Sequence, residues 1–208
     1  LAKGEYDQAI ADATEALRLA PRAVPAFGTR AAAHRMRGEY DQSIADATEA
    51  LRLNPQFAFA WFTRATSCLG KGAFDQAVAD ATEAIRLVPT AAPAYGSRAA
   101  AHLGRKDLDQ AIADATEALR LDPRYAAAYG TRAEAHRMKG EYDRAIADAA
   151  AAVRLDPNSP LAYGTRGSAF RLKGDFISAI ADLTEALRLN PQIGWVRQQL
   201  ELAQRRER

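Results

Sequence analysis

The sequence lacks the features that would indicate a disulfide-stabilised fold or a membrane protein. Its only cysteine is Cys68, so no internal disulfide can form. This leaves the redox compartment open, with the cytoplasm favoured. No uncharged apolar run approaches the roughly 20 residues that cross a bilayer, and no signal peptide is visible, although the first residue is Leu1 rather than Met. We therefore expect no membrane contact.

The sequence also lacks a charge excess and the common catalytic motifs. It has 28 Lys and Arg against 26 Asp and Glu, a net charge of +2. No basic cluster of the nucleic-acid-binding kind is present, so nucleic acid is not an expected partner. P-loop, dinucleotide-turn, H-E-x-x-H and G-x-S-x-G patterns are missing as well. We expect no enzyme, no catalytic residue and no cofactor.

What the sequence does contain is one block, Ala9–Pro21, that returns throughout its length. The later copies are Ser43–Pro55, Ala77–Pro89, Ala111–Pro123, Ala145–Pro157 and Ala179–Pro191, so that the closing prolines are always 34 residues apart. A fixed period of this length indicates a stack of similar supersecondary units. Ala, Leu, Ile, Arg, Glu and Asp dominate and no segment alternates with period two, which predicts an all-α fold.

The period predicts the boundaries of the repeats. We expect a partial repeat over 1–23, full repeats over 24–57, 58–91, 92–125, 126–159 and 160–193, and a capping helix over 194–208. Each full repeat reads as a helix, a turn usually bearing Gly, a second helix and a Pro that stops it. Leu1–Gly4 matches the segments that close first helices, so the chain is expected to begin near the end of one. Stacked repeats share their core, which predicts a single domain over 1–208.

These features resemble the tetratricopeptide repeat (TPR) family across essentially the whole chain. The family pattern, W-x2-L-G-x2-Y, A-x3-F and P, is followed at the first aromatic position, at two small residues of each second helix and at the proline. The aromatics are Phe27, Trp61, Tyr95, Tyr129 and Tyr163. The resemblance implies a right-handed superhelical solenoid of antiparallel helix pairs, with first helices on the concave face.

The chain departs from the family where the pattern has Leu. Arginine stands there in every full repeat, at Arg30, Arg64, Arg98, Arg132 and Arg166. An aspartate recurs at the matching level of each second helix. Because buried charges are normally paired, we predict one Arg–Asp pair in each repeat, such as Arg30–Asp46, and a structural role for the arginine.

The three histidines share one register but lie in different repeats. His34, His102 and His136 replace the Tyr of the family pattern, as Cys68 does in the second repeat. Packed helices lie roughly 8–10 Å apart, so that these side chains could not easily converge on one ion at about 2 Å. We expect packing histidines, a small buried cysteine and no metal site.

By resemblance, positions 2, 5, 6, 9, 12 and 13 of each repeat line the concave face. Position 5 is Gly28, Gly96, Gly130 or Gly164, but the second repeat has Phe59 at position 2 and Phe62 at position 5. Glycine inside a helix costs about 1 kcal/mol relative to alanine, so we expect close packing by a neighbouring helix at these glycines, with a bound chain as the alternative. The Lys and Asn that chaperone-binding TPR domains carry at positions 5, 6 and 9 are missing, which disfavours a chaperone C-terminus.

The sequence therefore favours a non-enzymatic scaffold that binds a peptide or protein segment in the concave groove. Phe59 and Phe62 are the expected apolar anchors, with Phe62 the more exposed, because aromatic anchors tend to dominate binding. The expected lining is Thr29, Thr63, Thr66, Thr131 and Arg35. The alternatives are self-assembly into dimers or filaments and the TPR region of a larger enzyme or signalling protein. High Ala and Arg content favours a bacterial source.

Overall fold

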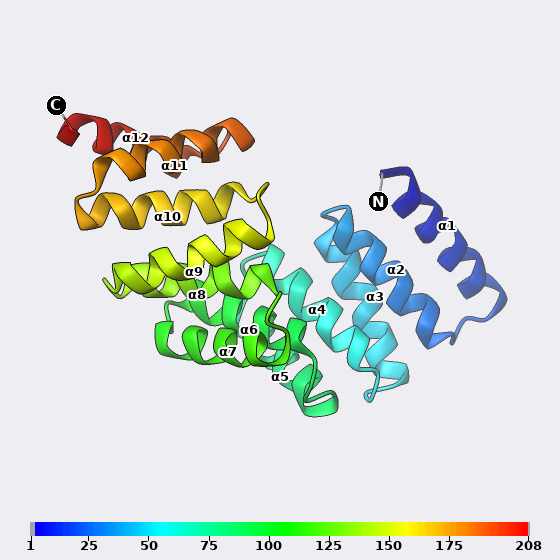
Figure 1. The fold of residues 1–208 in the computed structure, drawn as a ribbon. Helices are drawn as coiled ribbons and strands as arrows, with labels where there is room; N and C mark the ends of the chain where they lie inside the picture. Colours follow the sequence, from blue (N-terminus) through cyan, green and yellow to red (C-terminus); the bar gives the residue numbers. More distant parts are fainter. Residues whose placement is uncertain (1–2, 208) are drawn as a thin grey trace. The chain divides into compact units, whose positions relative to one another are not determined.

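A computed structural model describes residues 3–207 of the chain, and this part contains twelve α-helices and no strand (Figure 1). The helices are α1 (Lys3–Leu19), α2 (Val24–Met36), α3 (Tyr40–Leu53), α4 (Ala58–Gly70), α5 (Phe74–Leu87), α6 (Ala92–Arg105), α7 (Leu108–Leu121), α8 (Ala126–Met138), α9 (Tyr142–Leu155), α10 (Pro160–Lys173), α11 (Phe176–Leu189) and α12 (Gly194–Glu207). The predicted all-α fold is confirmed, and each predicted full repeat contains two helices. Within residues 3–207, no helix is long and apolar enough to cross a bilayer.

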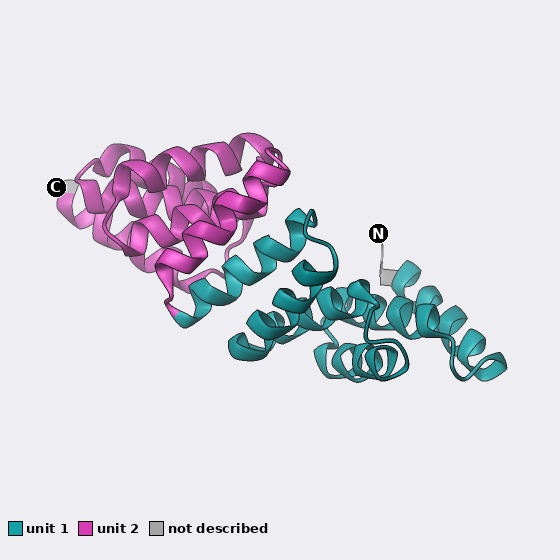
Figure 2. Cartoon of the chain, turned by 90° about the horizontal axis from the view of Figure 1, so that it is seen from below, with its two compact units in different colours: residues 1–105 teal, residues 106–208 magenta. Residues whose placement is uncertain are grey.

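The helices fall into two compact units, unit 1 over Leu1–Arg105 and unit 2 over Lys106–Arg208 (Figure 2). In unit 1 each helix packs on the next, and α4 also packs on α2 and α6. In unit 2 each helix again packs on the next, and α10 also packs on α8 and α12. Each unit thus has a layer of first helices and a layer of second helices. The third repeat contributes to both units, and one continuous domain over 1–208 stays a prediction.

The N-terminal end differs from the sequence prediction. Lys3 and Gly4 belong to the first turn of α1, whereas Leu1–Gly4 was expected to close an earlier helix. The other turn glycines follow a complete first helix and take a positive φ, as Gly38 does at 78°. Lys3 and Gly4 have no such helix before them in the described chain, so the backbone can simply continue α1. Leu1 and Ala2 lie outside the described residues.

The turn inside each repeat depends on one residue in the left-handed conformation. Gly38, Gly72, Gly140 and Gly174 have φ values of 74–93°. In the first repeat the following amide, Glu39 N–H, donates to the His34 carbonyl at 2.9 Å, which closes the helix end. In the third repeat Lys106 takes the place of glycine with φ 67°, the one positive φ of a non-glycine residue within residues 3–207.

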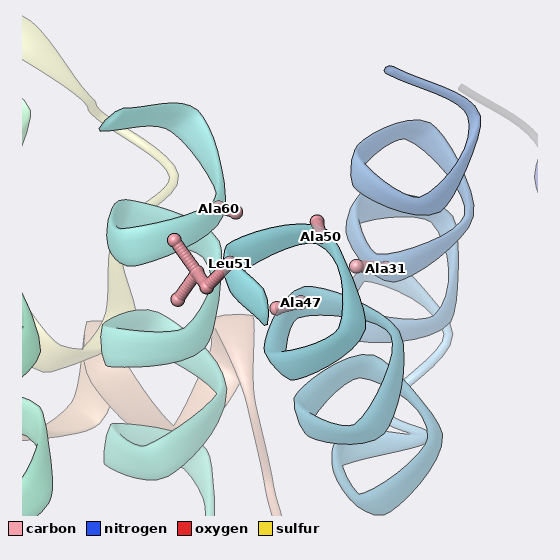
Figure 3. Packing of buried hydrophobic residues seen from close by; sticks show 5 residues of the cluster. All are labelled: Ala31, Ala47, Ala50, Leu51 and Ala60. Atoms are coloured by element: carbon pink, nitrogen blue, oxygen red, sulfur yellow. The ribbon is translucent and has the colours of Figure 1, made fainter. Parts of the chain in front are cut away.

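The core is built mainly from alanine, which lets the helices approach closely. In the first two repeats Ala31, Ala47, Ala50, Leu51 and Ala60 are at most 6% exposed and face one another between α2, α3 and α4 (Figure 3). The larger Phe27, Phe57 and Trp61 pack around them and are only partly buried. Small residues at the centre and aromatics at the margin thus hold the helix layers together while part of each ring stays at the surface.

Candidate binding surface

The residues expected to bind a peptide lie mostly on α2 and α4 of unit 1. We call the group Thr29, Arg35, Phe59, Phe62 and Thr66 the α2–α4 surface. Phe59, Phe62 and Thr66 share one side of α4, because residues three or four apart lie on one side of a helix, and α4 packs against α2, which carries Thr29 and Arg35. All five retain solvent exposure. The α2–α4 surface is therefore a place where another chain could make contact.

Phe59 is the most prominent apolar side chain of the α2–α4 surface. It is 45% exposed, and its ring packs against Phe57 with 5.9 Å between centroids. A Cβ placed on Gly28 would lie 2.7 Å from Phe57 Cε1 and 3.3 Å from Phe59 Cδ1. Glycine at position 28 therefore makes the room that both rings occupy, which holds Phe59 in place with one side open to solvent.

Phe62 is only partly exposed, so the prediction that it would be the more exposed of the two is wrong. It lies about one turn further into α4, a helix that packs on α2 and on α6. Neighbouring helices therefore cover more of Phe62 than of Phe59, which stands in the first turn. Phe59 is thus the more exposed aromatic side chain of the α2–α4 surface.

Thr29, Thr66 and Thr131 differ in exposure and in location. Thr29 is exposed, whereas Thr66 is partly buried and its hydroxyl donates to the Thr63 carbonyl at 2.9 Å. Thr131 lies on α8 in unit 2, where its hydroxyl donates to the Ala127 carbonyl at 3.0 Å, so it is not part of the α2–α4 surface.

The prediction for Thr63 is wrong, because this side chain is 1% exposed and cannot line a binding surface. The position of Thr63 within its repeat explains this burial. In the fifth repeat the same position is Thr165, which donates to Glu134 of the preceding first helix at 3.3 Å. Position 6 therefore faces the preceding first helix, and Thr29, which shares this position, is exposed because no first helix stands before α2 among the described residues.

The glycines at position 5 have two different environments. A Cβ on Gly164 would lie 2.7 Å from Trp195 Cη2 and 2.9 Å from Val196 Cγ2, so that this glycine, like Gly28, admits a side chain of the next first helix. A Cβ on Gly130 would meet nothing within 4 Å. The packing interpretation is confirmed at Gly28 and Gly164, and packing does not account for Gly130.

Sequence reasoning missed two further exposed apolar side chains, Leu161 and Trp195 in unit 2. These side chains are 59% and 41% exposed, and they come from α10 and α12, which pack together. Both occupy the register of Phe59, because 161 and 195 follow 59 by whole multiples of the 34-residue period. That register was the signal that could have found them.

The arginines of the recurring series form the predicted ion pairs. Arg30 binds Asp46 with two hydrogen bonds, of 2.8 Å from Nε and 2.7 Å from Nη2. The same two-bond pairing is found in Arg64–Asp80, Arg132–Asp148 and Arg166–Asp182. Hydrogen bonding to the carboxylate raises the pKa of each of these arginines. The corresponding Arg98 and Asp114 fall in different compact units, and their pairing stays a prediction.

Four guanidinium groups of the series also contact the preceding repeat through a threonine hydroxyl. Nη1 is the donor in each case, and the distances are 3.2 Å for Arg30–Thr14, 3.1 Å for Arg64–Thr48, 3.2 Å for Arg98–Thr82 and 3.1 Å for Arg132–Thr116. Aromatic rings lie 4.9–5.8 Å from the guanidinium carbons of the whole series, for example Trp61 beside Arg64. This arginine series therefore joins helices within and between repeats and is not available for a ligand.

His34, His136 and Cys68 interact with other parts of the protein and are mostly shielded from solvent. His34 Nδ1 lies 2.6 Å from Glu39 Oε2, and His136 Nδ1 lies 2.6 Å from Glu141 Oε2. Cys68 is 3% exposed, and burial raises the pKa of its thiol. Among the described residues no cluster of three His, Cys, Asp or Glu side chains could hold a metal ion. His34 and His136 are thus hydrogen-bonded within the protein and Cys68 is buried.

Stacked helix pairs with a left-handed residue in each inner turn define a helical-repeat protein. Models of the tetratricopeptide repeat match residues 1–56, 29–92 and 97–160, and a further such model matches residues 161–193. The chain belongs to the tetratricopeptide repeat family. Members of this family generally mediate protein–protein interaction, bind proteins or peptides, and are typically non-catalytic scaffolds.

Solved structures of the same fold support this assignment. One is a thermophilic TPR protein of Thermus thermophilus, with a TM-score of 0.73 and 22% identity, covering 88% of this chain and 99% of that one. A second is the Cut9–Hcn1 hetero-tetramer of the APC/C, with a TM-score of 0.87 and 20% identity, covering 96% of this chain and 40% of that one.

A third structure of the same fold is YrrB, described as a TPR protein with an unusual peptide-binding site. Its TM-score is 0.66 at 17% identity, and the match covers 94% of this chain and 97% of that one. At these identities the likeness to all three structures shows the fold alone. The comparison with curated proteins gave no match.

Proposed function

We propose that this protein is a non-enzymatic interaction scaffold that binds a peptide or protein segment on the α2–α4 surface. The observation that carries the proposal is the Phe59 ring, which is 45% exposed yet held against Phe57 over the space left by Gly28. An aromatic side chain that is already fixed in place loses little freedom when a ligand covers it, and such residues commonly dominate binding energies.

The polar residues around Phe59 suit the backbone of a bound segment. Thr29 is exposed on α2, and its hydroxyl can donate to a carbonyl of a segment that extends across this helix. The hydroxyl of Thr66 already donates to its own helix, but its oxygen can still accept from a peptide N–H. A ligand would therefore place an apolar side chain on Phe59 and Phe62 and its backbone beside Thr66.

Selection from a peptide library tests this proposal. The wild-type protein is compared with Phe59→Ala and with Leu19→Ala, a matched control because Leu19 is 69% exposed but lies at the end of α1. Circular dichroism confirms equal helicity of the three proteins. We expect peptides that bind the wild type and the control at least about ten-fold more tightly than Phe59→Ala.

Two other outcomes would point elsewhere. Peptides that bind Phe59→Ala as well as they bind the wild type would contradict the α2–α4 site and direct attention to Leu161 and Trp195. Multimers in light scattering, with no peptide selected, would instead favour self-assembly.

A further inference from the structure

Three arginines occupy position 12 of their repeats, and two of them are satisfied within the protein. Arg137 binds Glu134 with two hydrogen bonds, of 2.8 Å from Nε and 2.6 Å from Nη2. Arg171 Nε donates to Gln199 Oε1 at 2.7 Å. The third residue of this set is Arg35 on the α2–α4 surface.

Arg35 has no such partner within the described residues, and its Nε is buried without a hydrogen bond. The sequence explains the difference, because Ala32 stands three residues before Arg35, where Glu134 stands before Arg137. A buried polar nitrogen normally has a partner, so an unsatisfied one needs an explanation. The group that Arg35 lacks is a carboxylate three residues earlier on the same helix, which the fourth repeat has as Glu134.

The layer of first helices in unit 1 provides no substitute carboxylate. Neither α2, α4 nor α6 contains a single Asp or Glu, whereas each contains at least one arginine. Arg30 and Arg64 are neutralised by aspartates of the second-helix layer. Arg35 is therefore a positive charge without a counter-charge on a surface that carries no negative charge of its own, which favours an acidic ligand.

We propose that Arg35 binds a carboxylate side chain of the segment captured on the α2–α4 surface, so that the ligand is an acidic peptide. This inference rests on the proposed function and adds the chemistry of the ligand. Arg35 remains partly exposed as a residue, so a carboxylate can reach its Nη groups. A change of rotamer then exposes Nε and completes a two-bond contact of the kind that Glu134 makes with Arg137.

The repeat register also predicts how far the acid lies from the apolar anchor. Arg171 reaches Gln199, and the same register places Arg35 beside Thr63. Thr63 follows Phe59 by four residues, or about 6 Å along the helix axis. An extended peptide advances about 3.3 Å per residue. The acidic residue is therefore expected about two or three residues from the side chain that covers Phe59.

The test is a selection from a library of twelve-residue peptides that have one fixed Leu and random residues elsewhere. The library is selected on the wild type and on Arg35→Ala, and the recovered peptides are sequenced. We expect Asp or Glu to be enriched two or three residues from an apolar residue on the wild type, and not on Arg35→Ala. A synthetic peptide with this pattern should bind Arg35→Ala about ten-fold more weakly or worse.

Three further variants separate loss of the carboxylate contact from general damage. Ala32→Glu places an internal carboxylate where Glu134 stands in the fourth repeat, so it should abolish the acid preference while leaving the protein folded. Ala32→Gln adds similar volume without charge and should keep the preference. Arg137→Ala removes an arginine that is already paired and should keep it too.

The outcomes distinguish this inference from the proposed function. Peptides that share an apolar residue without an acid, or an acid preference that survives both Arg35→Ala and Ala32→Glu, would overturn the role of Arg35 and leave apolar capture intact. A wild-type protein that selects no peptide at all would overturn both.

Discussion

At the scale of single residues, each described Arg–Asp pair is a largely buried ion pair at the position where the family pattern has an apolar leucine. Where the family pattern has Leu, Arg64 lies with 15% of its side chain exposed, and its partner Asp80 has none exposed. The guanidinium is bonded to Asp80 and Thr48 and lies 4.9 Å from the Trp61 ring centroid. Removing one partner would leave a buried charge uncompensated, whereas replacing both with apolar residues would not.

We therefore expect Arg64→Ala to lower the free energy of unfolding by about 3–5 kcal/mol. The double variant Arg64→Leu/Asp80→Leu should lose less than Arg64→Ala, because it leaves no unpaired charge. Arg52→Ala is the control, since Arg52 and Glu49 form an exposed pair whose removal should cost far less than the loss of Arg64. Urea denaturation measures all three, and equal losses for Arg64→Ala and Arg52→Ala would contradict the structural role of Arg64.

Lys106 is the second residue whose substitution should change the free energy of unfolding. Its φ of 67° places a Cβ in the left-handed region, which costs about 1–2 kcal/mol for residues other than glycine. Lys106→Gly should therefore raise the free energy of unfolding by about 1 kcal/mol. Lys106→Ala keeps the strain and should not stabilise. Thermal unfolding of both variants checks this, and equal midpoints for Gly and Ala would contradict it.

At the scale of helices, the layers fit because large residues of one helix meet glycines of another. A Cβ on Gly104 would lie 2.4 Å from Phe74 Cε1, and one on Gly70 would lie 2.4 Å from Tyr40 Cζ. Exposed ion pairs join the same helices further out, as Arg105 does with Asp75 at 2.9 Å. These exposed pairs contribute little by themselves, so the ring-on-glycine contacts are the stronger determinant of how α5 and α6 pack.

Two glycine substitutions should have opposite effects. Gly104→Ala drives a methyl group into the Phe74 ring and should destabilise by about 1–3 kcal/mol. Gly130→Ala meets nothing within 4 Å and should stabilise α8 by up to about 1 kcal/mol, because alanine is the better helix former. Chemical denaturation gives both values, and a shared sign would contradict the packing described here.

At the scale of the whole molecule, the 34-residue period was sufficient to predict the helix pairs, their order and the family. The Arg–Asp pairs could also be predicted, since an aspartate recurs with every arginine. The exposure of individual lining residues could not be predicted. Thr63 and Thr66 lie on the same helix, yet only the packing of neighbouring first helices decides that Thr63 is buried. The missing partner of Arg35 could have been read from Ala32, but only once the Glu134–Arg137 pair was known.

Acid should destabilise the molecule through carboxylates spread along the chain. The pKa values of Glu15, Glu49, Glu117, Glu185, Asp175 and Glu141 are lowered, each mainly by a hydrogen bond with a neighbouring side chain, such as that of His136 with Glu141. A pKa that is lower in the folded than in the unfolded state stabilises the protein above the unfolded value, and this contribution is lost as the pH falls through the folded value.

The thermal unfolding midpoint should therefore stay constant near neutral pH. It should decrease once the pH is lower than about 4.5, the ordinary pKa of a glutamate. Because these groups lie at the surface, added salt should weaken the effect. Thermal scans between about pH 6 and pH 3 at two salt concentrations test this, and a midpoint that rises on acidification would contradict it.

The most direct test of the account is to locate a bound peptide by photo-crosslinking. A benzophenone amino acid is placed at position 59 in one protein and at position 19, another strongly exposed site of unit 1, in a second. Each protein is irradiated with a peptide selected on the wild type. We predict a crosslink to the peptide from position 59 and none from position 19. A crosslink from position 19 alone, or equal crosslinking at both positions, would contradict peptide binding on the α2–α4 surface.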